Sequence, residues 1–389
     1  MFDEARQKLS QQHLWRELIS IDSPSDVHID LPDRSVLLFA SNNYLGLANH
    51  PAIKAAAIAA IQRFGVGAGA SRLISGSLTP HRELEEHLAR FKGTEGALAF
   101  SSGYTTNLGV IPALMKDRGL ILADRLCHAS LFEGCRLSKA RLRIFHHNDP
   151  EHVRRLLSKR PINQPTLILT EGVFSMDGDL APLPELVALA KQFEATLLVD
   201  DAHGTGVMGP TGRGTAEHFQ LRPTDVLHMG TLSKAIGGSG GFMAGPKNLT
   251  DYLINTARPF IFSTAPPPSI AAAAIAALHV IQDEPERRIR LWTNRNHLYQ
   301  GLKQMGFQLT SSESPIIPIL LHDPEQAIRM SQALLQEGFF IPAIRPPTVP
   351  KGTSRLRLTV TADHTADQID SCLAAFRRVG TTLHIIDPA

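Results

Sequence analysis

The middle of the chain alternates short apolar runs with helical patterns, and this alternation limits the fold more than any other feature. A run is strand-like when it is short, apolar and bounded by turn residues. Strand-like runs occupy residues 97–101, 120–123, 142–145, 166–170, 195–199 and 226–230, and the helical patterns between them include 150–159 and 183–193. Strands that alternate with helices build a mainly parallel sheet covered on both faces, so the expected class is α/β.

The pattern changes towards the C-terminus. A long charged helix is expected to end near residue 305, and the elements after it are expected at 316–321, 324–337, 356–360 and from 366 onward. This order of helices and strands is typical of an α+β arrangement. We therefore expect an N-terminal helix and strand arm (1–46), a large α/β domain (47–283) and a smaller C-terminal α+β domain (284–389).

Composition indicates an ordinary soluble enzyme. Of 389 residues, 43% are hydrophobic and 20% are charged, and the net charge is +2, which implies no nucleic acid or other polyanion as partner. The apolar stretch 270–281 is too short to span a bilayer, which takes about 20 residues, and the N-terminus lacks the apolar core of a secretion signal. We expect a cytoplasmic protein without a membrane segment.

Three cysteines occur, at Cys127, Cys135 and Cys372. An odd number without disulfide-like spacing suits a reducing compartment. Nothing beside Cys127 marks it as an activated nucleophile, so packing is the expected role of all three. No set of metal ligands is predicted.

One lysine and one aspartate carry the strongest chemical signal. Lys234 ends the sequence Thr-Leu-Ser-Lys and is followed by a glycine-rich stretch, so its amine could form an imine with a phosphorylated aldehyde while the hydroxyls of Thr231 and Ser233 hold the phosphate. Asp200 follows the run 195–199 and could keep a pyridine nitrogen protonated, as pyridoxal phosphate (PLP) requires.

Each of these residues also fits a structural role when it is taken alone. Asp200 could cap a turn, and Lys234 could be a solvated loop lysine. A Walker-type phosphate loop is not indicated, because its Gly-x-x-x-x-Gly-Lys-Ser/Thr pattern is absent and the glycines follow the lysine. The pair together favours the cofactor site.

Several polar residues follow strand-like runs directly: Ser101, Ser175, Asp200 and Lys234. Ligands collect at the carboxyl ends of the strands in such sheets, so these residues are expected to converge. Gly103 and Tyr104 open a predicted helix after a strand, and their backbone N–H groups could meet a phosphate. An ordinary strand-to-helix turn would give the same pattern.

Four further motifs extend the case over nearly the whole chain. They are Ser-Asn-Asn-Tyr-Leu-Gly-Leu at 41–47, Gly-Ala-Gly-Ala-Ser-Arg-Leu-Ile-Ser-Gly at 67–76, Ser-Ser-Gly-Tyr-Thr-Thr-Asn at 101–107 and Glu-Gly-Val-Phe-Ser-Met-Asp-Gly-Asp at 171–179. With the Lys234 and Asp200 motifs, the chain resembles the α-oxoamine synthases, which are PLP enzymes of fold type I.

That resemblance implies a set of cofactor contacts. Thr231 would complete a phosphate cup that Gly103 and Tyr104 begin. His128 would stack on the cofactor and contact substrate, and His203 would hydrogen-bond the phenolic oxygen, with Ser175 beside it. In this family a threonine of the neighbouring subunit also reaches the phosphate, and Thr264 is the matching position, so a homodimer with shared active sites is implied.

Thr264 lies in the segment 258–268, which is apolar and stiffened by proline. Such a segment needs a surface to cover it, and a two-fold pairing would place one segment over each of two sites. The alternative is a buried connection within one subunit, with Thr264 satisfied locally.

The resemblance also implies substrate contacts. Arg357 matches the arginine that binds the amino-acid carboxylate, a task suited to a planar fork. Arg355 faces the same side of its strand, so the residues alone do not separate the two arginines. Arg16, Asn42 and Thr348 match positions near the acyl substrate.

The implied reaction joins an amino acid to an acyl thioester and releases carbon dioxide. The freed Lys234 amine would act as the base at the Cα–H, which requires a pKa below the reference value of about 10.4 or a neutral amine left by imine exchange. The resulting carbanion would spread into the ring held by Asp200 and attack the thioester carbonyl.

The segment 343–359 favours the family member that uses L-alanine and a pimeloyl thioester, carried by coenzyme A or by acyl carrier protein, in biotin biosynthesis. A sister enzyme that uses glycine, of the 2-amino-3-ketobutyrate ligase or 5-aminolevulinate synthase type, is an alternative. A PLP-binding protein without catalysis is a second one.

Overall fold

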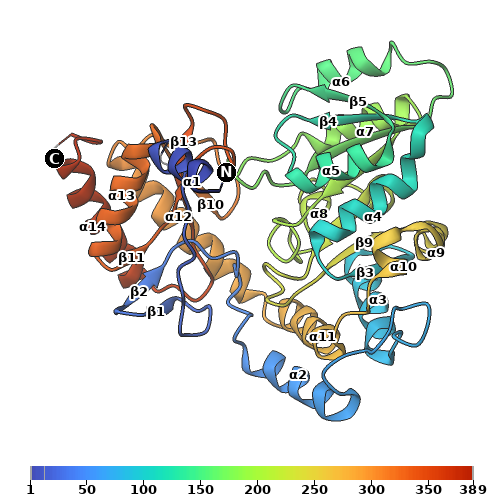
Figure 1. The fold of residues 1–389 in the computed structure, drawn as a ribbon, viewed down its shortest axis with the longest axis horizontal. Helices are drawn as coiled ribbons and strands as arrows, with labels where there is room; N and C mark the ends of the chain where they lie inside the picture. Colours follow the sequence, from blue (N-terminus) through green and yellow to red (C-terminus); the bar gives the residue numbers. More distant parts are fainter. Residues whose placement is uncertain (1, 13, 388–389) are drawn as a thin grey trace. The chain divides into compact units, whose positions relative to one another are not determined.

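The computed structural model describes residues 2–12 and 14–387, which pack as two compact units. We call Leu47–Ser175 with Leu180–Pro285 the sheet unit, and Met1–Gly46 with Met176–Asp179 and Glu286–Ala389 the terminal unit (Figure 1). The three-part division at residues 46 and 283 remains a prediction.

A seven-stranded sheet forms the centre of the sheet unit, in the order β3-β9-β8-β7-β6-β4-β5. β9 is the one antiparallel member, so the expected α/β class with a mainly parallel sheet is confirmed. The strands are β3 (Gly96–Phe100), β4 (Leu120–Asp124), β5 (Arg141–Phe145), β6 (Thr166–Glu171), β7 (Thr196–Asp200), β8 (Leu227–Thr231) and β9 (Gly241–Gly245).

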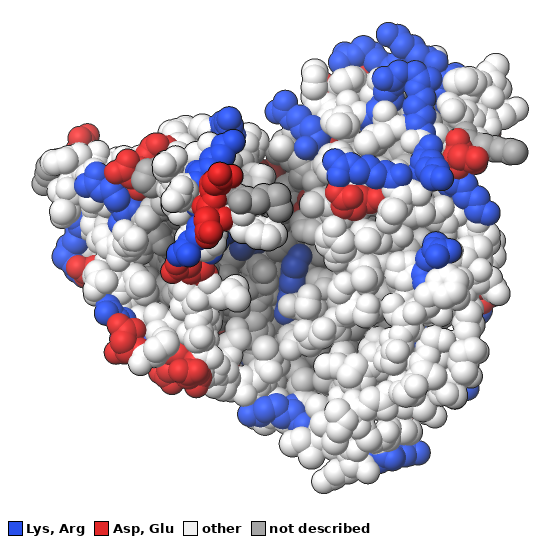
Figure 2. Space-filling model, viewed as in Figure 1, with Lys and Arg blue, Asp and Glu red and all other residues white. Residues whose placement is uncertain are grey.

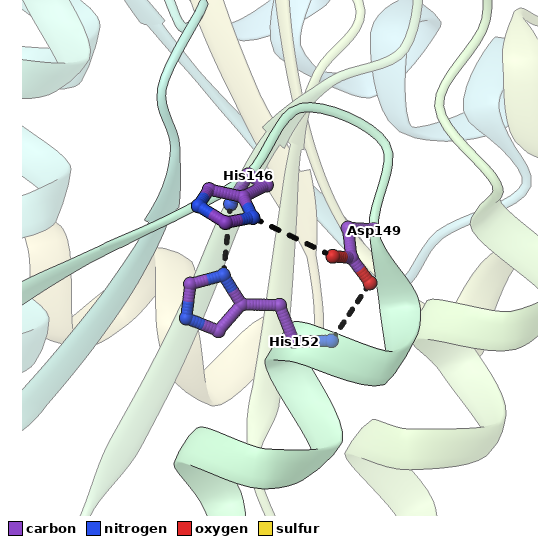
Figure 3. A group of neighbouring side chains, drawn as sticks. All are labelled: His146, Asp149 and His152. Atoms are coloured by element: carbon purple, nitrogen blue, oxygen red, sulfur yellow. Dashed lines mark hydrogen bonds and ion pairs between the residues drawn. The ribbon is translucent and has the colours of Figure 1, made fainter.

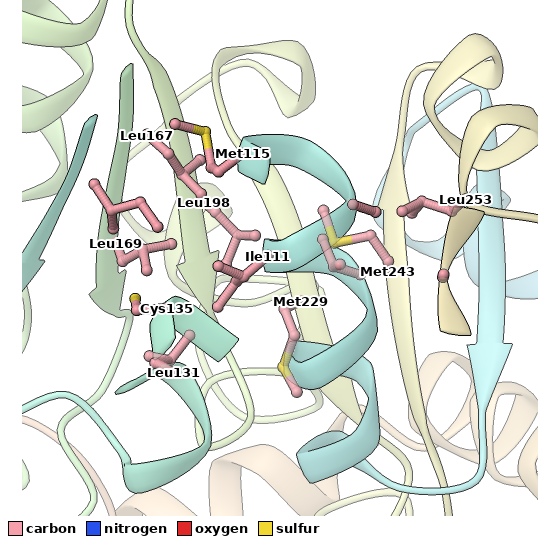
Figure 4. Close-up of a cluster of buried hydrophobic side chains, with 14 of the residues drawn as sticks. Ile111, Met115, Leu131, Cys135, Leu167, Leu169, Leu198, Met229, Met243 and Leu253 are labelled. Carbon is pink, nitrogen blue, oxygen red and sulfur yellow. The ribbon is translucent and has the colours of Figure 1, made fainter. Parts of the chain in front are cut away.

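Helices cover both faces of this sheet. They are α2 (Pro51–Phe64), α3 (Thr79–Lys92), α4 (Gly103–Met115), α5 (Ala129–Ser138), α6 (Pro150–Leu157), α7 (Leu183–Gln192), α8 (Thr215–His218), α9 (Lys247–Thr256), α10 (Arg258–Phe262) and α11 (Pro268–Asp283). One buried cluster joins α4, α5 and α9 to the sheet (Figure 4), and a second cluster joins α6 and α7 to the opposite face.

Alternation along the strands decides which face each side chain joins. In β7, Leu198 belongs to the cluster under α4 and α5, whereas Leu197 and Val199 belong to the cluster under α6 and α7. β4 and β6 divide their side chains in the same way, as expected for a sheet that is buried on both faces. Asp200 therefore continues the row of Leu198, towards α4 and α5.

The sheet ends at β5 with charged side chains. Arg141 and Arg143 are exposed on this edge strand, and Figure 2 shows Lys and Arg gathered over β5 and α6. Charges on an edge strand oppose pairing with a second chain.

The turn between β5 and α6 holds a small polar cluster of His146, Asp149 and His152 (Figure 3). Asp149 caps α6, because its Oδ1 accepts the His152 backbone N–H at 2.8 Å. His152 Nδ1 accepts the His146 backbone N–H at 3.2 Å, and the two rings lie 4.5 Å apart. These contacts are those of a helix cap.

The terminal unit holds two three-stranded sheets, β1-β2-β11 and β10-β13-β12. Its strands are β1 (His28–Leu31), β2 (Arg34–Leu38), β10 (Ile316–His322), β11 (Phe339–Phe340), β12 (Ala343–Ile344) and β13 (Ser354–Thr359), and its helices are α1 (Phe2–Gln11), α12 (Glu286–Gln304), α13 (Pro324–Gln336) and α14 (Ala366–Thr382). The expected smaller α+β arrangement of the C-terminal elements is confirmed.

All three cysteines are free and buried. Burial raises the pKa of Cys127 and Cys372 well above the usual range and that of Cys135 to about 12, so the expected packing role is confirmed. Among the described residues, no helix combines the length and the apolar character that crossing a membrane demands.

Candidate active site

A pocket of about 290 Å³ opens at the carboxyl ends of β6, β7 and β8, beside the first turns of α4 and α5. Its lining includes eight of the nine residues predicted to bind the cofactor: Gly103, Tyr104, His128, Ser175, Asp200, His203, Thr231 and Lys234. The sheet unit alone thus brings together motifs that are far apart in the sequence.

Three pocket residues share one face of the sheet because of the strand alternation. Glu171, Asp200 and Thr231 each end a strand, two residues beyond a side chain that packs under α4 and α5, namely Leu169, Leu198 and Met229. A residue at that spacing points to the same face. The strand ends therefore aim two carboxyl groups and one hydroxyl at the pocket.

The first turn of α4 forms one wall. Ser102 is the N-cap residue, and its Oγ accepts the Thr105 backbone N–H at 3.1 Å. Gly103 packs against β9, where a Cβ added to Gly241 would lie 2.6 Å from the Gly103 Cα. The absence of side chains at both positions leaves the helix N-terminus close to the strand, where its N–H groups can bind an anion.

Hydroxyl groups continue this wall. Thr231 Oγ1 donates to the Gly240 carbonyl at 2.8 Å and lies 2.7 Å from Ser233 Oγ. The Tyr104 ring is half exposed and stands edge-on to the His128 ring at 6.4 Å.

Lys234 faces a histidine. Its Nζ lies 2.8 Å from His203 Nε2, and both residues line the pocket. An amine and an imidazole at this distance can share a proton.

Asp200 is held in place from both sides. Its Oδ2 accepts a hydrogen bond from Asn107 Nδ2 at 2.9 Å, and its Oδ1 accepts the Ala202 backbone N–H at 3.2 Å. The carboxylate is buried, with 6% of the residue exposed.

Glu171 is a pocket residue to which the sequence analysis gave no role. Its Oε2 accepts the Ser175 N–H at 3.3 Å, while its buried Oε1 has no hydrogen-bond partner in the described structure. Burial, and secondly the charge of Asp200, raise the pKa of Glu171 to about 8. Its place at the start of the 171–179 motif, directly after an apolar run, was the available signal.

The chemistry of this set fits a phosphorylated aldehyde cofactor. A lysine amine, a buried carboxylate and a helix N-terminus with hydroxyl groups occupy separate walls of one pocket. These are groups that can meet an aldehyde, a ring nitrogen and a phosphate, respectively. The residues present therefore match PLP.

Of the predicted substrate residues, His128 lines the pocket of the sheet unit, and the other four lie in the terminal unit. Arg357 Nη2 donates to Asn42 Oδ1 at 3.2 Å, and the Arg16 guanidinium donates to the Pro346 carbonyl at 3.2 Å, in the loop that carries Thr348. Arg355 instead forms an ion pair with Asp177, at 2.6 Å. This ion pair separates the two arginines that strand alternation alone left equivalent.

Thr264 does not line the pocket of its own chain. It is exposed and bridges to Ser71, and the neighbouring Ala265 N–H donates to the Ala70 carbonyl at 2.9 Å. Its predicted contact with a partner's phosphate remains a prediction.

Comparison with known proteins assigns the family. The family Aminotransferase class I and II matches residues 34–376. The chain therefore belongs to this family, and its curated relatives include 8-amino-7-oxononanoate synthases. It is 48% identical over 383 residues to the 8-amino-7-oxononanoate synthase of Geobacter sulfurreducens, covering 98% of each chain.

Solved structures agree. A serine palmitoyltransferase from S. paucimobilis with bound PLP and myriocin matches with a TM-score of 0.94 and 36% identity, covering 99% of this chain and 98% of that one. The 8-amino-7-oxononanoate synthase of Francisella tularensis matches with a TM-score of 0.77 and 28% identity, covering 90% of this chain and 99% of that one. The predicted resemblance to the α-oxoamine synthases, and the fold type that it implied, are confirmed.

Proposed function

We propose that this chain is a PLP-dependent acyltransferase that condenses L-alanine with a pimeloyl thioester to 8-amino-7-oxononanoate, carbon dioxide and the free thiol carrier. The observation that carries the proposal is the meeting of Lys234, Asp200 and the α4 N-terminus in one pocket. Relatives named for this reaction are 48% and 46% identical to the chain over 98% of its length, which supports the choice of substrates. Biotin biosynthesis and a cytoplasmic location belong to the same proposal.

When bound, PLP supplies an electron sink for the bond that breaks at the amino acid's Cα. The chain's residues do the rest. The α4 N-terminus and Thr231 would hold the phosphate, and Asp200 would keep the ring nitrogen protonated. Lys234 Nζ would take the Cα proton. His203, 2.8 Å away, orients the amine and would hydrogen-bond the phenolic oxygen, with Ser175 beside it.

His128 lines the pocket, where it would stack on the ring and contact the substrate. In the terminal unit, Arg357 binds the amino-acid carboxylate, and its 3.2 Å hydrogen bond to Asn42 orients the guanidinium. Arg16 and Thr348 bind the acyl substrate, and the Arg16 guanidinium is tied to the loop of Thr348 by its hydrogen bond to the Pro346 carbonyl. Arg355 is not assigned a substrate, because Asp177 neutralises it.

Incubation of the purified protein with L-alanine or glycine and a panel of acyl thioesters, on coenzyme A and on acyl carrier protein, tests the function. Mass analysis of the product is the measurement. We expect 8-amino-7-oxononanoate from L-alanine and a pimeloyl thioester. Product from glycine alone would support a glycine-using sister enzyme, and PLP binding without any product would support a protein without catalysis.

We also propose that the active species is a homodimer in which Thr264 completes the partner's phosphate site. Apolar side chains near the Ser71–Thr264 bridge are exposed, among them Ile74 at 80% and Phe262 at 69%. Sedimentation on dilution, paired with activity and bound cofactor, tests this assembly. Dissociation should release cofactor and activity together, and a monomer with full turnover would rule the shared site out.

A further inference from the structure

A series of hydrogen bonds connects two groups that line the pocket, Asp200 and His128. Asn107 Nδ2 donates to Asp200 Oδ2 at 2.9 Å and to Ser130 Oγ at 2.9 Å. Ser130 Oγ in turn lies 2.8 Å from His128 Nδ1. Asn107 lies in the second turn of α4 and is fully buried, so it acts behind the pocket wall.

The Asp200 carboxylate sets which group donates in the hydrogen bonds of this series. An ionised carboxylate only accepts hydrogen bonds, so the Asn107 amide must turn its NH₂ group towards Asp200. The two amide hydrogens then go to Asp200 and to Ser130 Oγ. In this orientation the Asn107 Oδ1 atom is buried and has no hydrogen-bond partner in the described structure.

The same logic reaches the imidazole. Ser130 Oγ accepts from Asn107, and its single hydrogen is directed to His128 Nδ1, because that nitrogen is already an acceptor of a backbone N–H. The Ser130 backbone N–H also donates to Nδ1, at 3.2 Å, because His128 is the N-cap residue of α5. A nitrogen that accepts two hydrogen bonds carries no proton, so the proton of the neutral ring is on Nε2.

We propose that Asn107 and Ser130 are positioning residues that hold His128 as the neutral ring protonated on Nε2 and couple that ring to Asp200. The inference rests on the proposed function in one respect, that this ring lies against the cofactor. An uncharged ring is suited to that place, because a second positive charge would oppose the protonated pyridine that Asp200 maintains.

The surrounding charges agree with a neutral ring. The groups that face His128 are Asp200 from β7, Lys234 from the loop after β8, the Tyr104 ring from α4 and the Glu171 carboxyl from β6, which meets the His128 backbone. Burial is the largest influence and lowers the pKa of His128, Lys234 lowers it further, and Asp200 acts in the opposite direction.

Nitrogen-15 NMR of protein labelled in histidine, prepared without cofactor, tests the proposal directly. His128→Gln identifies the ring by the signal that it removes. In the wild type we expect His128 with unprotonated Nδ1 and protonated Nε2 from pH 6 to 8. A ring protonated on Nδ1, or on both nitrogens, at pH 7 would overturn the proposal.

Variants separate positioning from packing. Asn107→Leu keeps the volume but removes the donor to Ser130 Oγ, so the hydroxyl can rotate away from Nδ1 and the protonation midpoint of His128 should rise. Ser130→Ala should raise that midpoint by about one pH unit, the size expected for one lost hydrogen bond. Ser130→Thr should restore it. An unchanged His128 signal in both Asn107→Leu and Ser130→Ala would contradict the proposal.

Ser138→Ala is the matched control. Ser138 is a buried serine on the same helix, but its Oγ donates to the Cys135 carbonyl, so His128 should be unaffected. PLP affinity, followed by fluorescence against pH, adds a second measurement, which should weaken at low pH earlier in Asn107→Leu than in Ser138→Ala. If the NMR results hold while L-alanine and pimeloyl thioester give no product, the proposed substrates fail and the positioning network stands.

Discussion

Asp200 and Asp201 are neighbours in sequence but do different work because strand alternation turns them apart. Asp200 faces the pocket, whereas Asp201 forms a buried ion pair with Lys92 at 3.1 Å. Asp201 also accepts hydrogen bonds from the backbone and hydroxyl of Thr215. The pair Asp-Asp therefore provides one carboxylate that faces the pocket and one that forms a buried ion pair.

Replacing Lys92 by Met should destabilise the protein by about 3–5 kcal/mol, because the Asp201 charge would remain buried without its partner. Urea unfolding measures the loss. Arg82→Met removes an exposed ion pair from the same helix and should change the unfolding free energy by less than about 1 kcal/mol. Equal effects of the two variants would contradict this assignment.

Lys234→Ala should retain cofactor binding but lose turnover by about 10³-fold or more, since the phosphate contacts and Asp200 remain while the base is gone. PLP titration by fluorescence and product formation are the two measurements. Borohydride should fix labelled PLP to the wild type and not to the variant. Near-normal turnover in the variant would contradict the proposal that Lys234 is the base at Cα.

The sequence indicated which residues line the pocket where several motifs agreed, and it missed single residues that stand outside any distinctive pattern. Lys234 and Asp200 stand beside distinctive glycine-rich or strand-end patterns. Asn107 is an ordinary polar residue in a helix, and its contact with Asp200 depends on how α4 packs on the sheet, which spacing does not encode. His128 and His203 were found only through the family resemblance, because 17 histidines offer no other distinction.

At the scale of elements, β9 shows where pattern reading failed. Its sequence, Gly-Phe-Met-Ala-Gly, was not among the expected strand-like runs, yet it is a fully buried strand between β3 and β8. Glycine is a poor strand former, so propensity argued against a strand here. The close approach of α4 to this strand is what requires glycine at position 241.

Gly241→Ala should weaken PLP binding about tenfold or more, because the new Cβ would lie 2.6 Å from the Cα and N of Gly103 and push the first turn of α4 away. Fluorescence titration gives the affinity. Gly245→Ala is the matched control on the same strand, since its Cβ would meet only the flexible ends of Leu249 and Leu227, at 3.1 and 3.3 Å. A larger loss of affinity in Gly245→Ala would contradict the importance of the close contact between Gly241 and Gly103 for PLP binding.

At the scale of the whole molecule, two buried histidines make stability depend on pH. His228 donates from Nε2 to the Pro223 carbonyl at 2.8 Å in the sheet unit, and burial lowers its pKa to about 3. In the terminal unit, His364 packs against the Phe39 ring at 4.3 Å, and burial lowers its pKa to about 4.

Below about pH 6.5 these two histidines therefore bind protons in the unfolded chain but stay unprotonated in the folded one. The free energy of unfolding should be fully present above pH 6.5 and should fall as pH decreases, by up to about 1.4 kcal/mol per pH unit for each histidine. Urea unfolding between pH 7 and 4.5 measures the slope. His228→Gln should reduce the slope, and a wild-type stability that stays flat over this range would contradict the prediction.

The pairing of β2 with β11 has a consequence for biosynthesis. Leu37 lies opposite Phe339, so the strand made among the first residues acquires this parallel partner only after the entire sheet unit has left the ribosome. Domains fold as they emerge, so the sheet unit can fold first, while the edge of β2 that later pairs with β11 is still unpaired. An open strand edge invites pairing with other chains. The nascent chain, rather than the finished protein, is then the form in which this molecule most needs protection.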